Sequence, residues 1–169
     1  MWQAQGVGDV NRFLAMLKTR LKDNFMQNWN ARINDSSRAS FYNTFSQFQL
    51  QPYLNIVNIK KFRIALSKLR VSSHRLEIEA GRWNKPNKTP RENRKCKNCN
   101  ILEDEYHFLF ECTRYNNLRP NYFKSYYRLN SSMLKTVQLF KSCNENDIKK
   151  LATFVYKALE LRSDILLRT

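Results

Sequence analysis

Three of the four cysteines and one of the two histidines fall within one short window of the sequence. The window reads RKCKNCNILEDEYHFLFECTRY and covers residues 94–115. Its candidate ligands follow the spacing Cys-x2-Cys-x7-His-x4-Cys and are Cys96, Cys99, His107 and Cys112. Thiolate sulfur and imidazole nitrogen are donors that Zn²⁺ prefers, and four of them complete its tetrahedron. The spacing therefore predicts one bound zinc ion.

We expect this zinc site to be structural rather than catalytic, because four protein ligands leave no coordination position for water or substrate. The alternative is a set of ordinary buried cysteines or a disulfide. The Cys-x2-Cys spacing and the reduced state of intracellular thiols disfavour it. Cys143 stands alone and is expected to be a small core residue. His74 is too distant in the sequence to complete the site.

Acidic residues beside the predicted ligands allow a second interpretation; they are Glu103, Asp104, Glu105 and Glu111. Paired carboxylates can hold Mg²⁺. Acidic residues also stabilise the first turn of a helix through its dipole, and EDEYHFLFEC is typical of a helix start. We therefore expect these acids to serve a helix start, and the apolar residues among them to form a small core that the zinc stabilises.

The segment before the predicted site, residues 60–95, is strongly basic. It contains twelve Lys or Arg against three Glu, a net charge of +9. Such density predicts contact with nucleic-acid phosphates, since bound Lys and Arg release condensed counterions. The residues predicted to face nucleic acid are Lys60, Lys61, Arg63, Lys68, Arg70, His74, Arg75, Arg82, Trp83, Lys85, Lys88, Arg91, Arg94 and Lys95.

Two readings of this segment stay open at the level of sequence. Trp83 either stacks on an unpaired base or plugs the underside of the loop. The lysines either bind phosphate or form a solvated face. No helix-turn-helix or C2H2 finger pattern is present, so we expect no sequence-specific reader of duplex DNA.

The whole chain carries a formal net charge of +16, which indicates a polyanionic partner. RNA, DNA or both are the expected partners, with an anionic membrane surface as the competitor and no small-molecule substrate. No apolar run approaches the roughly 20 residues that span a bilayer. The opening MWQAQGVGDV lacks the features of a signal peptide, so we expect an intracellular protein, nuclear or cytoplasmic, that is not secreted.

Only three glycines and four prolines occur in 169 residues, which favours helices over tight-turned strands. We predict a mainly α protein, a small helical domain with an embedded Cys3His zinc knuckle and a basic loop. Apolar periodicity predicts core-facing helices over 10–34, from residue 36 to before Pro52, after Asn58, over 131–142 and over 147–167. A further helix is predicted to be broken near Pro120, and a short turn is predicted at 76–79. The expected divisions are 1–57, an N-terminal helical linker; 58–119, the basic helix-loop and knuckle; and 120–169, C-terminal helices on the same core.

Residues 66–119 closely resemble the C-terminal tail of reverse transcriptases from LINE-type (non-LTR) retrotransposons, in particular their animal branch. The motifs that carry the resemblance are LR-x-SSH-x-LEIE-x-GR, TPRE-x-R-x-C-x2-C, EDE-x-HFL and Y-x3-R. The flanking AQGVGD and NDSSRASFYNTF are similar to the segment that follows the polymerase in that family.

The resemblance implies that Cys96, Cys99, His107 and Cys112 bind zinc and that the basic run before them faces nucleic acid. In that family the tail grips template RNA and target DNA during target-primed reverse transcription. No Tyr/Phe-x-Asp-Asp motif or endonuclease site occurs here, so we expect no enzymatic activity. The expected function is a zinc-stabilised nucleic-acid-binding module; the alternative is a scaffold fragment that docks on a polymerase body or another protein.

Overall fold

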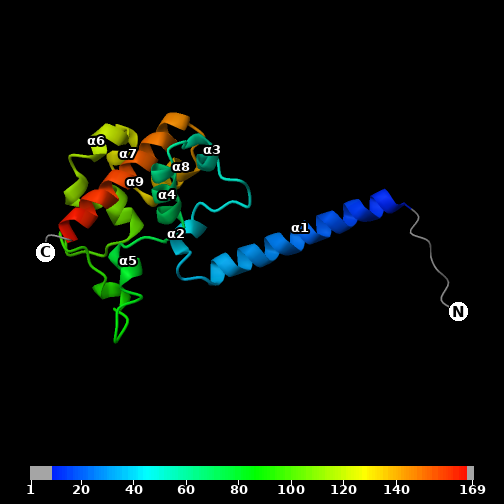
Figure 1. Ribbon diagram of the computed structural model, residues 1–169, viewed down its shortest axis with the longest axis horizontal. Coiled ribbons are helices and arrows are strands. Elements are labelled where there is room, and N and C mark those ends of the chain that lie inside the picture. Colours follow the sequence, from blue (N-terminus) through cyan, green and yellow to red (C-terminus); the bar gives the residue numbers. More distant parts are fainter. Residues whose placement is uncertain (1–8, 167–169) are drawn as a thin grey trace. The chain divides into compact units, whose positions relative to one another are not determined.

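Helices make up most of the chain that the structure describes, as the sequence predicts (Figure 1). The structure is a computed structural model and describes residues 9–166, with side chains up to residue 163. It divides into two units, Met1–Ser37 and Arg38–Thr169. None of the described helices is both long enough and apolar enough to cross a membrane.

The first unit contains one long helix, α1 (Val10–Asp35). Asp9 caps it, because its Oδ1 accepts hydrogen bonds from the backbone N–H groups of Asn11 and Arg12 at 2.9 and 3.2 Å. Its apolar stripe differs from our expectation of core packing, since no residue of α1 is buried. Phe13, Leu21 and Phe25 are each more than half exposed.

The helix predicted between residue 36 and Pro52 is wrong. The structure has only α2 (Ser40–Asn43), an irregular stretch, and then α3 (Tyr53–Ile56). The Thr44 hydroxyl donates to the Phe41 carbonyl at 2.8 Å, a local bond that competes with the helical ladder. Leaving the helix lets the Phe45 ring stack on Phe140, with 4.6 Å between ring centroids.

The remaining helices of the second unit agree better with the sequence pattern. They are α4 (Lys60–Arg70), α5 (Glu77–Ala80), α6 (Arg119–Tyr122), α7 (Ser125–Arg128), α8 (Met133–Lys141) and α9 (Glu145–Leu166). Ser132 caps α8 by accepting from the Lys135 N–H at 3.3 Å. Pro120 lies in the first turn of α6, so it starts a helix rather than breaking one. Residues 38–57, which we grouped with the N-terminal region, belong to this second unit.

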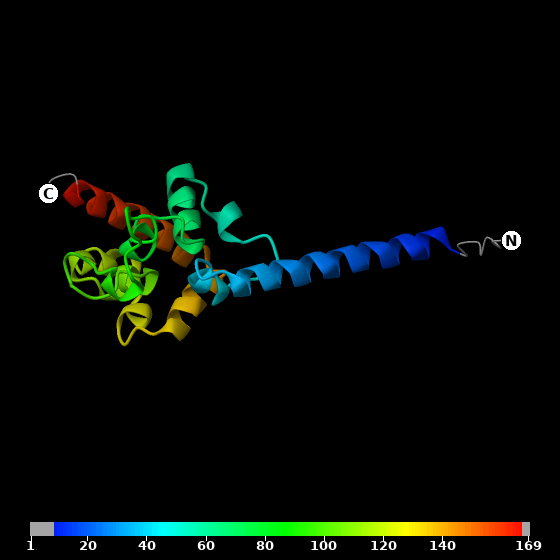
Figure 2. The ribbon, with the colours of Figure 1, turned by 90° about the horizontal axis from the view of Figure 1, so that it is seen from below.

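The core of the second unit forms around α9, which α4 crosses in both views (Figures 1 and 2). Ala152, Phe154, Val155 and Ala158 of α9 are fully buried. The Phe154 ring lies 4.5 Å from that of Phe123 and also contacts rings from the cysteine-rich segment. The aromatic core is therefore continuous between the long helices and residues 94–115.

A buried ion pair ties α9 to the cysteine-rich segment. Arg162 donates from Nε and Nη2 to the two carboxylate oxygens of Glu103, at 3.0 and 2.7 Å. The same carboxylate accepts from the Glu77 N–H at 2.7 Å, at the start of α5. Both side chains are less than a tenth exposed. One carboxylate thus joins three parts of the chain that lie far apart in the sequence.

We expect Arg162→Met to destabilise the second unit by about 3–5 kcal/mol, because it leaves the buried Glu103 carboxylate without its cation. Chemical denaturation of the metal-loaded protein measures the change. Lys149→Met is the matched control: it removes an exposed ion pair with Glu145 and should hardly move the midpoint. Equal midpoints for both variants would show that the buried pair contributes little.

Candidate metal centre

The structure brings the four predicted ligands together. Their ligand atoms all lie within 4.8 Å of one another and form a Cys3His cluster that could hold a metal ion. The Cys112 sulfur lies 3.9 Å from that of Cys96 and 3.8 Å from that of Cys99. Metal–sulfur bonds of about 2.3 Å in a tetrahedron separate two sulfurs by about 3.8 Å. The thiols are free, and these separations are far longer than a disulfide bond.

A tight turn presents Cys96 and Cys99 from the same side. Cys96 accepts from the Asn100 N–H at 2.8 Å and donates its own N–H to the Ile101 carbonyl at 2.7 Å. Asn100 has φ of 55°, a left-handed conformation that Asn tolerates better than most residues. The turn therefore depends on the polar residue that directly follows Cys99.

A π-helical turn, His107–Glu111, supplies the other two ligands. The Cys112 N–H donates to the His107 carbonyl at 2.8 Å, a bond across five residues that matches the x4 spacing between the ligands. π-turns are rare and often occur at functional sites. Asp104 accepts from the His107 N–H at 2.8 Å, so one of the neighbouring acids caps this turn as the sequence predicts.

The His107 imidazole fits a metal ligand because nothing else satisfies it. It is only 2% exposed, and neither ring nitrogen has a hydrogen-bond partner among the described residues. Buried polar atoms are normally paired, so a ring with two unpaired nitrogens needs an explanation. Nδ1 lies 3.5 Å from a carboxylate oxygen of Glu111. That placement leaves Nε2 for a metal, with Glu111 behind the ring to orient it.

The thiols repel one another as thiolates, which favours a bound cation. Burial, together with the neighbouring Cys96 and Cys99, raises the pKa of Cys112 to about 12. Burial also acts to raise the pKa of Cys99, but hydrogen bonds led by those from Thr113 and Asn98 outweigh it and lower that pKa to about 6. Asn98 and Thr113 are bonded to each other at 2.7 Å. Sequence spacing gave no signal for this supporting pair.

The other acids of the segment are committed to protein partners rather than to Mg²⁺. Glu103 is paired with Arg162. Glu105 accepts from the Ser72 hydroxyl at 2.6 Å and lies 3.0 Å from Nε2 of His74. Burial acts to raise the pKa of Glu105, but these two partners outweigh it and lower that pKa. The magnesium interpretation therefore has no support in the arrangement of these side chains.

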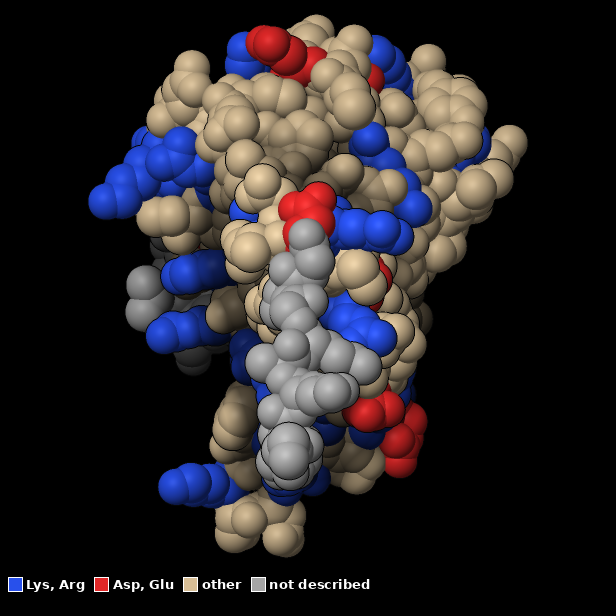
Figure 3. Space-filling model, turned by 90° about the vertical axis from the view of Figure 1, so that its right-hand side faces the viewer, with Lys and Arg blue, Asp and Glu red and all other residues tan. Residues whose placement is uncertain are grey.

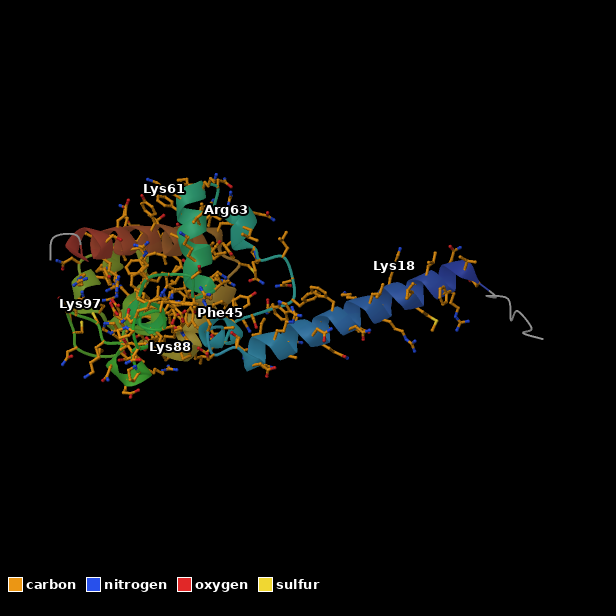
Figure 4. The ribbon with its side chains drawn as sticks, turned by 60° about the horizontal axis from the view of Figure 1, so that its bottom comes forward. Lys18, Phe45, Lys61, Arg63, Lys88 and Lys97 are labelled. Carbon is orange, nitrogen blue, oxygen red and sulfur yellow. The ribbon has the colours of Figure 1, made fainter. Side chains whose placement is uncertain are left out.

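The predicted nucleic-acid residues fall into three groups in the structure. Arg63, Arg82 and Arg94 are half-buried, and Arg70 and the His74 side chain are buried. Figure 4 shows Lys61 and Arg63 on α4, away from Lys88 and Lys97 near the cysteine-rich segment. The exposed ones are Lys60, Lys61, Lys68, Arg75, Trp83, Lys85, Lys88, Arg91 and Lys95.

Three expectations about single residues need correction. The Arg70 guanidinium donates to the Phe140 carbonyl and the Gln51 side chain, so it does not face solvent. The His74 ring bonds Glu105 and accepts from the Leu76 N–H, so neither it nor Arg70 belongs to the exposed basic surface that we expected to face nucleic acid. Cys143 is exposed rather than a core residue. Arg70 and His74 bond residues that lie far from them in the sequence, and the exposure of Cys143 depends on where α8 ends. No local sequence pattern reveals either.

Comparisons with models of known protein families, with curated proteins and with solved structures found no match. The resemblance to LINE-type reverse transcriptase tails therefore stays a prediction.

We expect Cys99→Ser to abolish metal binding, since it removes one of four ligands and the other three cannot close the tetrahedron. Native mass spectrometry should show one metal per wild-type chain and none in the variant. Cys143→Ser is the matched control and should keep its metal. Chelation should also lower the melting temperature of the wild type steeply; an unchanged melting temperature would contradict a structural metal.

Proposed function

We propose that this chain is a zinc-stabilised, non-catalytic module that binds RNA or single-stranded DNA, derived from the C-terminal tail of a LINE-type reverse transcriptase. The observation that carries the proposal is the exposure of Trp83, at 70%, in a basic loop that shortly precedes the Cys3His cluster in the sequence. The proposed setting is the nucleus or cytoplasm, on nucleic acid and beside a reverse transcriptase body.

Zinc is the metal that the ligand set fits best. Three thiols and an imidazole are soft and borderline donors, and the sulfur separations match a tetrahedral ion with zinc–sulfur bonds. With all four ligands from protein, the ion stabilises structure and leaves no position for a reacting water. Structural zinc sites have apparent binding energies of about 10–16 kcal/mol, enough to order a segment with little regular structure.

The basic loop, residues 81–90, is held rigidly at its base. The Thr89 N–H donates to the Gly81 carbonyl at 2.9 Å and closes the loop. Arg94 donates to the carbonyls of Thr89 and Ile78, both at 2.9 Å. A side chain on Gly81 would meet the Arg94 Cγ at 2.7 Å, so glycine is required for this approach. Arg94 lies two residues before the first ligand, so the metal centre and the loop share one support.

Arg94 also connects to the buried ion pair, since its carbonyl accepts from the Glu103 N–H at 2.9 Å. The loop therefore presents Trp83 from a fixed base, and the exposed Lys85 and Lys88 follow it in the same loop. An exposed flat ring in a loop with exposed cations suits a nucleic-acid base that stacks while nearby phosphates are neutralised. An indole that is 70% exposed is not a plug under the loop, and this exposure supports the proposal that Trp83 stacks on a base.

The surface charge supports a polyanionic partner. Lys and Arg side chains are widespread on the face shown in Figure 3, and acidic ones are few. Several acids of the second unit are buried in contacts with Arg, Ser and His, so they neutralise little of the exposed positive charge.

Docking on a protein is the second candidate function, and α1 is the observation that favours it. Phe13, Leu17 and Leu21 recur at helical spacing and are 41% to 60% exposed. A polymerase body with an apolar groove would cover such a stripe. Both functions are compatible, because the stripe and the basic loop belong to different units.

We expect the zinc-loaded protein to bind single-stranded RNA or DNA with strong salt dependence. If about six phosphates are contacted, the slope of log affinity against log salt should be about −4. Gel shifts over a salt series measure it. Absence of binding at low salt by folded, metal-loaded protein, with co-purification of a protein partner instead, would favour the docking function.

Trp83→Ala should weaken this binding about tenfold, equivalent to about 1.4 kcal/mol, because one base loses its stacking platform. Tyr126→Ala is the matched control, since Tyr126 is also an exposed aromatic residue but lies outside the loop. The same loss in both variants would show that the loop has no special role. Lys88→Gln should make the salt slope shallower by about 0.7.

A further inference from the structure

A cavity of about 210 Å³ lies beside α4, away from the Cys3His cluster. Residues 47–53, the end of α8 and the start of α9 complete its wall. Arg70 and Lys141 contribute positive charge to the lining, and no Asp or Glu is among the residues that line it. Ser142 and Cys143 also line it, and Cys143 is an exposed free thiol.

The Arg70 guanidinium in this wall is buried without a counterion. It is 3% exposed. Its hydrogen bonds go to two neutral acceptors, the Phe140 carbonyl at 3.1 Å and the Gln51 side chain at 2.7 Å. Aromatic rings surround it, with those of Phe45 and Tyr53 at 4.6 and 4.8 Å. No ion pair joins it to a carboxylate in the part of the chain that the structure describes.

The two other buried arginines of the described residues differ in whether a carboxylate pairs with them. Arg162 is paired with Glu103 and Glu77. Arg119 donates to two neutral acceptors, the Leu109 carbonyl and the Asn116 side chain, both at 2.7 Å, and it does not line this cavity. Around Arg70, burial lowers its pKa and the opposing groups are tyrosines, which are neutral at neutral pH.

The neutral partners of Arg70 compensate its charge only in part. Phe140 lies in the last turn of α8, so its carbonyl offers the partial negative charge of a helix end. Ring faces add a weaker attraction. Of the five N–H donors of a guanidinium, two are used by these hydrogen bonds, which leaves capacity for an oxyanion.

We propose that this cavity binds a phosphate group, with Arg70 as the principal donor and Lys141 as a second cation at its edge. The Ser142 hydroxyl accepts from the Asn144 N–H at 3.1 Å and keeps its own proton to donate. Two cations and a hydroxyl around one cavity suit an anion with several acceptor oxygens better than a two-oxygen carboxylate. Gln51 is a positioning residue: it holds Arg70 while its amide donates to the carbonyls of Gln47 and Gln49, both at 3.1 Å.

Two sources could present this group, a free phosphate or the 5′-phosphate at the end of a nucleic-acid strand. Both offer the same terminal oxyanion to the same donors. The site is separate from the Cys3His cluster and from the basic loop, so its occupation does not depend on whether the loop binds nucleic acid.

Cys143 provides a local readout, because the other three cysteines are held in the cluster. The rate of Cys143 alkylation is measured on the full metal-loaded chain with increasing inorganic phosphate, against sodium chloride and sodium acetate at equal ionic strength. We expect low-millimolar phosphate to slow alkylation at least about tenfold at saturation, and chloride and acetate to have no such effect. No protection by phosphate, or equal protection by acetate or chloride, overturns the proposal.

Variants separate the site from general electrostatics. Lys141→Gln, an exposed change that leaves the core intact, should weaken phosphate protection several-fold. Arg70→Lys should weaken it about tenfold or more, because a lysine cannot offer a planar fork. Lys150→Gln on α9 is the matched control and should leave it unchanged; equal effects of Lys141→Gln and Lys150→Gln would overturn the assignment.

The two sources are distinguished with short single strands that carry a 5′-phosphate or a 5′-hydroxyl. Stronger protection of Cys143 by the phosphorylated strand than by inorganic phosphate supports a strand end as the ligand. Protection by inorganic phosphate alone supports a free phosphate. Failure of both, with gel-shift binding intact, would overturn this site and leave the proposed function standing.

Discussion

The gathering of one imidazole and three thiols is the constraint on which the second unit depends. Residues 94–115 contain a single isolated β-bridge, Lys95 with Leu102, and helical turns of five residues or fewer. Such a segment has few backbone hydrogen bonds of regular secondary structure, and its aromatic residues pack against α9. A metal ion held by these four ligands would fix the two halves of the segment, the tight turn and the π-turn, at one separation.

Glu103 connects the cysteine-rich segment to other parts of the second unit. Its backbone bonds the Arg94 carbonyl and the Ile78 N–H, and its carboxylate bonds Arg162 and the Glu77 N–H. The knuckle, the start of α5, the base of the basic loop and the C-terminal helix therefore meet at one buried residue. A substitution in any of these elements should destabilise the others, because it costs free energy to leave a buried carboxylate without one of its partners.

Sequence predicted what depends on local spacing and missed what depends on distant partners. The ligand spacing and the α4, α8 and α9 periodicities are local, and the structure has them. Apolar periodicity predicted a helix between residue 36 and Pro52. Phe41 and Phe45 in that segment instead pack against Phe140, which lies nearly a hundred residues later in the sequence. Glu103 and Arg162 are 59 residues apart, and no periodicity connects them.

Basic residues close in the sequence have different roles in the structure, which limits what charge counting can show. Within residues 60–95, Arg70 and Arg94 are donors that organise the fold, whereas Lys85 and Lys88 are exposed. Charge density therefore overstates the number of basic side chains that are exposed and says nothing about their arrangement in space. The structure adds that Trp83 projects from a base fixed by Arg94 and Gly81. Under the proposed function, a ring held in place before binding loses less freedom when a base stacks on it, so rigidity of the support, as much as charge, should set the affinity of this loop.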